Sequence, residues 1–189
     1  MQFFIFILQL LFFINSLASA AEGLDIFQVA KEGTSKQMRE LIDSGIDFSK
    51  KDGNGRNALM NAVIFGNKET VLVLLEKFKD IETKDSQGMN PLTLSLRYGD
   101  SEMTKILLEN GASVNSKMED GSIPLIFAAL EGQMSSVRLL LDYNSDVNFR
   151  TNYGETALIV ASFEGYIGIV RLLLNAGADI NAVNEEGFT

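Results

Sequence analysis

Glycine recurs every 33 residues through most of the chain. One series of five glycines keeps this spacing without a slip: Gly55, Gly88, Gly121, Gly154 and Gly187. A second series keeps the same spacing: Gly33, Gly66, Gly99, Gly132 and Gly165. A fixed period of this length is typical of repeat architectures, in which one repeat cannot bury its apolar face without neighbours. The period predicts a stack of similar small units, whose long surface suits binding better than catalysis.

The residues around each glycine predict a turn followed by two helices. The first glycine of each repeat fits a turn that needs a positive φ. Asn57, Asn90 and Thr156 can cap the helix that follows, because their side chains can accept hydrogen bonds from its free amides. Both prolines, Pro91 and Pro124, stand at the first helical position, where a missing N–H costs nothing. The second glycine of each repeat is predicted to end this helix in the left-handed region.

A second helix with an inward apolar pair is predicted in the other half of each repeat. The pairs are Leu41-Ile42, Leu74-Leu75, Leu107-Leu108, Leu140-Leu141 and Leu173-Leu174. This helix is predicted to end at Gly45, Gly111 and Gly177, with Asn144 in the same role, because asparagine also tolerates the left-handed region.

The chain resembles the ankyrin repeat family from about Leu24 onward. The hallmark Thr-Pro-Leu-His appears here as Asn57-Ala58-Leu59-Met60, Asn90-Pro91-Leu92-Thr93, Ile123-Pro124-Leu125-Ile126 and Thr156-Ala157-Leu158-Ile159. The histidine is lost every time, the threonine is kept once, and Phe78 replaces one closing glycine. The resemblance implies an all-α repeat solenoid, an ankyrin-type stack of helix-turn-helix units with β-turn fingers.

The period also predicts the domain organisation. A signal peptide is predicted at residues 1–20, an N-terminal capping repeat at 21–51, full ankyrin repeats at 52–84, 85–117, 118–150 and 151–183, and the start of a further, truncated repeat at 184–189. No capping helix follows the last full repeat in the sequence. We therefore expect part of its apolar surface to be uncovered, at Ile159, Ala161, Ile169, Leu172 and Leu173.

The first twenty residues contain no charged side chain and are mostly apolar. They end in Ala18-Ser19-Ala20, the small-x-small pattern of signal peptidase sites, so that Ala21 would become the first residue. The apolar run is short for a membrane span of about twenty residues. We expect a secreted or periplasmic protein with no membrane contact after cleavage. Because no Lys or Arg precedes the run, an uncleaved N-terminal membrane anchor is the alternative.

Composition argues against catalysis and against nucleic acid. The chain has no His and no Cys, so it lacks the commonest general base and the usual ligands of zinc and soft metals. We expect no enzyme activity, no cofactor and no metal. The net charge is −9 and the pI is about 4.5, and such a surface repels phosphate backbones.

The resemblance implies that a partner meets the fingertips and the exposed side of the first helices. The residues predicted to bind protein on the matching positions are Arg56, Phe65, Met89, Arg97, Tyr98, Leu130, Tyr153 and Phe163. Neighbouring matching positions include Asp120, Ser122, Glu155, Glu164 and Phe188. Aromatic residues, Met and Arg are enriched in interface cores. For Phe65, Leu130 and Phe163, packing between repeats is the alternative.

A row of cations also follows the period: Lys51, Lys84, Lys117 and Arg150. They are predicted either to form local ion pairs with adjacent carboxylates, which contribute little at a screened surface, or to serve as a ladder for an acidic partner.

These features favour an exported ankyrin-repeat protein that binds another protein, of unknown identity, through a concave surface of fingertips and first helices. One alternative is a membrane-anchored structural or scaffold protein with an uncleaved N-terminal segment. A second alternative is the targeting part of a longer enzyme.

Overall fold

The computed structural model describes residues 25–77 and 80–189, and these contain ten α-helices and no β-strand. The helical content confirms the predicted all-α repeat fold. The proposed signal peptide with its site at Ala18, Ala20 and Ala21 lies outside the described residues, as does Phe78. The chain divides into two compact units, here called the N-terminal body (Met1–Lys79) and the C-terminal body (Asp80–Thr189).

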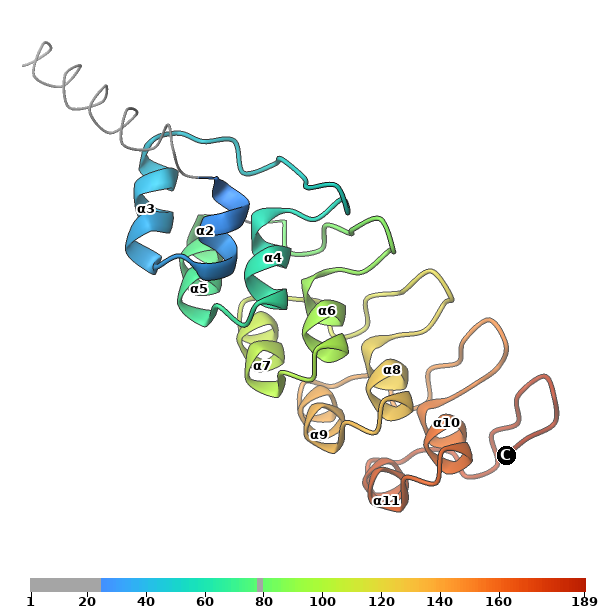
Figure 1. The fold of residues 1–189 in the computed structure, drawn as a ribbon. Coiled ribbons are helices and arrows are strands. Elements are labelled where there is room, and N and C mark those ends of the chain that lie inside the picture. Colours follow the sequence, from blue (N-terminus) through green and yellow to red (C-terminus); the bar gives the residue numbers. More distant parts are fainter. Residues whose placement is uncertain (1–24, 78–79) are drawn as a thin grey trace, which may run out of the picture. The chain divides into compact units, whose positions relative to one another are not determined.

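Helices come in pairs within each body (Figure 1). The N-terminal body contains α2 (Ile26–Glu32), α3 (Ser35–Asp43), α4 (Ala58–Ile64) and α5 (Lys68–Lys77). The C-terminal body contains α6 (Pro91–Arg97), α7 (Ser101–Glu109), α8 (Pro124–Leu130), α9 (Met134–Asp142), α10 (Ala157–Phe163) and α11 (Ile167–Asn175). In the C-terminal body the first helix α8 packs against both α6 and α10, while the second helix α9 packs against α7 and α11.

The predicted N-caps are confirmed. The side-chain oxygen of Asn57 accepts a hydrogen bond from the Met60 amide at 2.9 Å, and Asn90 does the same for α6. Thr156 caps α10 through its hydroxyl. Pro91 and Pro124 occupy the first turns of α6 and α8, as predicted. Each first helix therefore begins at the residue that the repeat period assigns to it.

The predicted left-handed helix ends are confirmed with one exception. Positive φ is found at Gly66, Gly99, Gly132, Gly165, Gly45, Gly111, Gly177 and Asn144. The prediction for Gly33 is wrong, because its φ is −77° and its backbone is extended. Only Gly33 and Thr34 separate α2 from α3, whereas three residues separate α4 from α5. With this shorter connection Gly33 lies close to the last turn of α2. A Cβ added at Gly33 would lie 2.6 Å from the carbonyl oxygen of Val29, which is too close for any other residue type.

A five-residue finger precedes each first helix from α4 onward and recurs once more after α11, with the same backbone geometry. The amide of the first residue donates to the carbonyl of the fifth in Asp52–Arg56, Asp85–Met89, Met118–Ser122, Thr151–Glu155 and Asn184–Phe188, at 2.9–3.0 Å. The fourth residue is the periodic glycine, and all five of these glycines have the predicted positive φ. Residues 184–188 therefore form the same finger as the earlier repeats.

Side chains at the first finger position hold most fingers closed. Asp85, Thr151 and Asn184 each accept hydrogen bonds from the amides two and four residues later. Met118 has no oxygen to offer, and in its finger Asp120 accepts instead from the amide and hydroxyl of Ser122. The fingers are thus fixed by local polar contacts.

Polar side chains also join neighbouring repeats inside each body. In the C-terminal body Asn148 accepts from the Asp179 amide at 2.8 Å, and Asn115 accepts from the Asp146 amide at 3.0 Å. In the N-terminal body Arg39 on α3 donates to Glu76 on α5 at 2.7 Å. This hydrogen bond lowers the pKa of Glu76.

The expectation for the last full repeat is wrong for four of its five residues. Ile159, Ala161, Ile169 and Leu173 are buried, and Leu172 is half-buried. These positions face the partner helix of their own repeat or the preceding repeat, since α10 packs on both α8 and α11. The large apolar side chains that remain exposed in this repeat include Ile167 and Ile180, which lie 67% and 64% exposed.

Candidate functional site

Two of the predicted binding residues lie in the N-terminal body. Phe65 follows the last residue of α4 and is 54% exposed, with the Lys31 ammonium 5.4 Å from its ring centroid. Arg56 is half-buried at the end of the first finger. Packing between repeats was the alternative role for Phe65. Because about half of its side chain is exposed, packing explains only the other half.

Asp52 fixes the finger that carries Arg56. Its carboxylate accepts from the amides of Asn54 and Arg56 at 2.8 and 3.0 Å, and from the side chain of Asn61 on α4 at 2.9 Å. Burial by itself would raise the pKa of Asp52. The hydrogen bonds, first that of Asn61, and the charge of Arg56 outweigh burial, so the pKa lies below its usual value. The carboxylate therefore stays charged at neutral pH and holds this finger against α4.

The other six predicted residues lie in the C-terminal body and separate into two sets. Arg97 on α6 lies against Met89 in the preceding finger, with its guanidinium 3.4 Å from the sulfur. Tyr98 directly follows α6 and is 52% exposed. The second set is Leu130, Tyr153 and Phe163.

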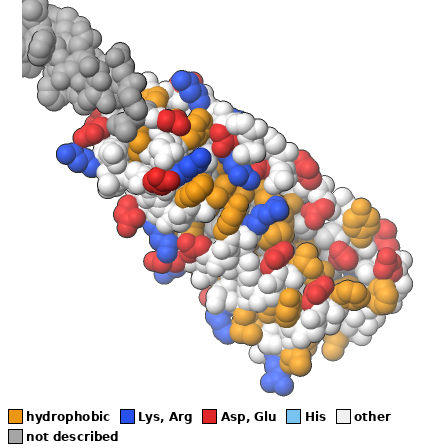
Figure 2. Space-filling view, viewed as in Figure 1, with side chains coloured by type: hydrophobic (Ala, Val, Ile, Leu, Met, Phe, Trp, Pro, Cys, Tyr) orange, Lys and Arg blue, Asp and Glu red, His pale blue; other side chains and the backbone are white. Residues whose placement is uncertain are grey.

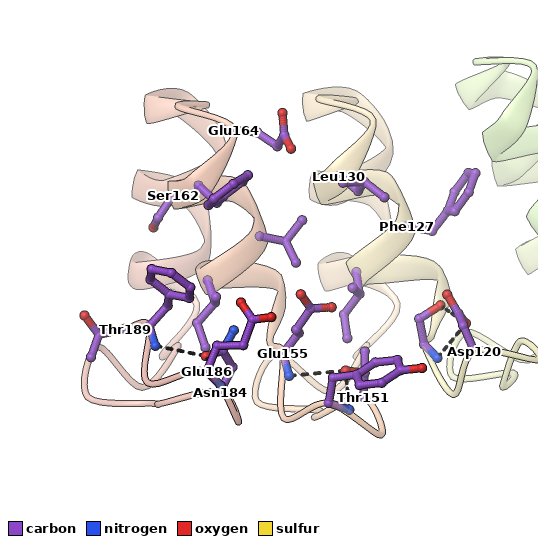
Figure 3. A pocket seen from close by; sticks show the side chains of 17 residues that line it. Asp120, Phe127, Leu130, Thr151, Glu155, Ser162, Glu164, Asn184, Glu186 and Thr189 are labelled. Carbon is purple, nitrogen blue, oxygen red and sulfur yellow. Dashed lines mark hydrogen bonds between the residues drawn. The ribbon is translucent and has the colours of Figure 1, made fainter.

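Leu130, Tyr153 and Phe163 line one groove. It has a volume of about 540 Å³ and lies between the first helices α8 and α10 and the fingers that begin at Met118, Thr151 and Asn184 (Figure 3). Tyr153 is 63% and Phe163 78% exposed. The structure thus brings together three of the eight predicted residues and leaves Met89, Arg97 and Tyr98 outside this groove.

The wall of the groove on the helix side is apolar apart from Ser162 on α10. It is built from Ile126 and Phe127 on α8 and from Ile159 and Val160 on α10. These pairs stand at equivalent positions, 33 residues apart, so that one turn of each first helix contributes the same face. Leu130 and Phe163, one turn further along, extend this apolar wall.

Every charged side chain that lines the groove is a carboxylate: Asp120, Glu155, Glu164 and Glu186. The basic residues of positions 118–189 are Arg138, Arg150 and Arg171, and none of them lines the groove. Figure 2 shows the same mixture of apolar and acidic side chains over α10 and the adjacent fingers.

The carboxylates of Glu155 and Glu186 come from neighbouring fingers and point toward the space below the first helices (Figure 3). The Glu155 amide is bound by the Thr151 hydroxyl at 3.2 Å, and the Glu186 amide by the Asn184 side chain at 3.1 Å. The two fingers are themselves joined, because the Glu185 amide donates to the Tyr153 carbonyl at 3.0 Å. Both acidic residues are therefore held on fixed backbone.

Sequence reasoning missed much of the groove. It had placed Asp120, Ser122, Glu155, Glu164 and Phe188 on matching positions, but not the following residues: Ile126, Phe127, Thr151, Ile159, Val160, Ser162, Asn184, Glu186 and Thr189. One signal could have found Phe127 and Val160, since they lie one helical turn before Leu130 and Phe163. Of the four acidic lining residues only Glu186 was missed. Their meeting in one groove could not be found from the period, because they come from three separate fingers and the end of α10.

Two members of the predicted cation ladder bind backbone in the next repeat. The Lys84 ammonium donates to the carbonyl of Lys117 at 2.8 Å, and Arg150 donates to the carbonyl of Val183. The Lys117 ammonium lies 5.4 Å from the ring centroid of Phe149. These three cations therefore have a structural role along the finger stems.

The repeat geometry agrees with the comparison of the chain with protein families. A model of ankyrin repeats, which spans three copies of the repeat, matches residues 26–118 and residues 113–184. The chain belongs to the ankyrin repeat family. A search of curated proteins gave no match.

Ankyrin repeats generally mediate protein–protein interaction and are typically binding domains without enzymatic activity. Within residues 25–77 and 80–189, no cluster of acidic side chains has the geometry to hold a metal ion. The helices of these ankyrin repeats are also too short or too polar for any of them to cross a membrane.

Proposed function

We propose that this ankyrin-repeat protein binds a partner protein through its fingertips and first helices, and that the groove between α8, α10 and the last three fingers is the centre of that surface. The observation that carries this proposal is the groove itself. It gathers Leu130, Tyr153 and Phe163, three of the residues predicted to bind, over one apolar wall. Exposed aromatic side chains beside a buried apolar wall are what interface cores use.

The proposed mechanism is rigid presentation of a preformed surface. The fingers that begin at Thr151 and Asn184 are closed by side-chain hydrogen bonds and joined by the bond from the Glu185 amide to Tyr153. Binding would then cost little conformational entropy for ordering these fingers, and little backbone rearrangement is expected.

Removing one exposed tyrosine ring is expected to weaken partner binding. Tyr98→Ala and Tyr153→Ala should each cost about 2 kcal/mol or more, the usual threshold of a hot spot, since tyrosine offers a broad apolar ring with a polar tip. The measurement is the affinity of a partner, isolated with the wild-type chain, for each purified variant.

Lys105→Ala is the matched control, because Lys105 is an exposed residue on the second helix α7 and pairs there only with Glu109 among the ion pairs described. Charge reversal at Lys84 and Lys117 should change affinity little. Full binding by both tyrosine variants together with loss in the lysine variants would move the site to the cation ladder and imply an acidic partner.

We also propose that the protein is exported and acts in a secreted or periplasmic location. The support is the uncharged apolar segment at residues 1–20 and its Ala18-Ser19-Ala20 ending. The protein isolated from its native compartment is expected to begin at Ala21 by mass spectrometry. Ala18→Arg with Ala20→Arg should block processing, because the peptidase pocket takes small side chains. A native chain that begins at Met1 would support the membrane-anchored alternative instead.

A further inference from the structure

We infer that the groove between α8, α10 and the last three fingers takes a basic peptide segment, an extended stretch of the partner in which Lys or Arg alternates with apolar side chains. This inference rests on the proposed function and names the chemistry of the partner. It follows from the juxtaposition, in one groove, of an apolar wall and a rim whose charges are all negative (Figure 3).

The rim carries negative charge that no ion pair among the described residues neutralises. Within the described residues, Glu155, Glu164 and Glu186 form no ion pair. Asp120 uses one carboxylate oxygen to bind Ser122, at 2.6 Å to the hydroxyl and 2.9 Å to the amide. A neutral or acidic segment lying in the groove would partly desolvate these carboxylates and give no charge in return, which is costly. A cation in the segment would offset that cost.

The arrangement of apolar wall and carboxylates matches the two parts of a basic side chain. Lys and Arg have aliphatic stems that pack along apolar surface while the charged head reaches a polar rim. Here Ile159 and Val160 would meet the stem, and Glu155 and Glu186 would receive the head. A guanidinium can bind a carboxylate through two parallel hydrogen bonds, which makes arginine the better fit.

The exposed aromatic rings favour the same partner. Tyr153 and Phe163 have free ring surface in the groove, and Phe188 is 52% exposed beside them. The face of an aromatic ring attracts a cation, whereas it gives no such attraction to a carboxylate or phosphate. Nucleic acid and acidic peptides are therefore the wrong chemistry for this groove.

The test is selection from a display library of random nine-residue peptides on the purified chain, with binding of the selected peptides measured at low and high salt. Peptides enriched in Arg or Lys between apolar residues are expected. Their affinity should fall about tenfold or more for the variant Glu155→Gln with Glu186→Gln, since hydrogen bonds to charged groups are lost. Added salt should also weaken their binding, because Glu186 is exposed and Glu155 is only half-buried.

A charge reversal of the groove gives the sharper comparison. Selection on Glu155→Lys with Glu186→Lys should shift the peptides from basic to acidic. The control is Glu109→Lys with Asp142→Lys, which changes the net charge equally at the ends of the second helices α7 and α9. The control should select the same basic peptides as the wild type. Helical circular dichroism of every variant checks that it is folded.

The outcomes separate this inference from the proposed function. Peptides that need Tyr153 but carry no basic residues would overturn the basic-peptide inference and leave the binding surface in place. If no selected peptide binds more weakly to Tyr153→Ala than to the wild type, both the basic-peptide inference and the proposed binding surface would be overturned. The wild-type chain could instead form a dimer at high concentration. If the variant Glu155→Lys with Glu186→Lys abolished that dimer, the occupant of the groove would be a second copy of the chain and not a peptide of another protein.

Discussion

Replacing Leu140 with alanine is expected to lower the free energy of unfolding of the C-terminal body by about 2–5 kcal/mol. Leu140 is fully buried on α9, and this helix packs against α7, α8 and α11. Truncation removes apolar contact at this fully buried position and leaves a cavity, which adds to the cost. Leu107→Ala, at the equivalent buried position of α7, should cost a similar amount.

Arg138→Ala is the control on the same helix. Arg138 is exposed, so its loss should change the free energy of unfolding by less than about 0.5 kcal/mol. Urea unfolding gives the midpoints, and amide exchange in α8 to α11 reports the same body directly, since repeat arrays need not unfold in one step. Equal midpoints for Leu140→Ala and Arg138→Ala would contradict the helix register described above.

The sequence predicted most of the local structure, because each helix cap and each turn depends on only a few neighbouring residues. Asn57, Asn90 and Thr156 each accept from an amide only three residues later. A glycine reaches positive φ without help from the rest of the fold. Gly33 is the instructive failure. Its spacing matches the series, but its conformation depends on the length of the connection to α3, which the period alone does not give.

The exposure of side chains in the last full repeat was predicted less well. The repeat sequence does not show whether an apolar side chain packs against the preceding or the following repeat. Ile159 and Leu173 are buried by helices of their own and the preceding repeat, so they need no following neighbour. Side chains directed the other way, such as Ile167, remain exposed. Periodicity identifies an apolar helix face but does not say which of two neighbours covers each residue on it.

The candidate site could be predicted by position but not by chemistry. Tyr153 and Phe163 follow from the repeat alone, since matching positions recur every 33 residues. Their neighbours Glu155 and Glu186 belong to different fingers, and their approach to one groove depends on how the fingers are joined. The negative charge of the whole chain gave no reason to expect that every charged side chain lining one groove would be a carboxylate.

Asn90→Ala is expected to lower the free energy of unfolding of the C-terminal body by about 2 kcal/mol. Asn90 is buried, and its side-chain oxygen caps α6 through the Thr93 amide at 2.9 Å. Its side-chain nitrogen donates to Glu82 at 2.8 Å and to the Ser116 hydroxyl at 3.1 Å. Loss of a cap costs about 1 kcal/mol, and leaving the half-buried Glu82 and Ser116 without their donor adds about 1 kcal/mol more.

The comparison that isolates this network is Asn90→Ser against Asn90→Ala. Serine can still cap α6 but cannot donate to Glu82 and Ser116 together, so it should recover about 1 kcal/mol of the loss. Asn175→Ala, at the exposed end of α11, should have little effect in the same urea unfolding experiment. Complete rescue by serine would show that capping alone is what Asn90 contributes, whereas no rescue would assign its effect to the contacts with Glu82 and Ser116.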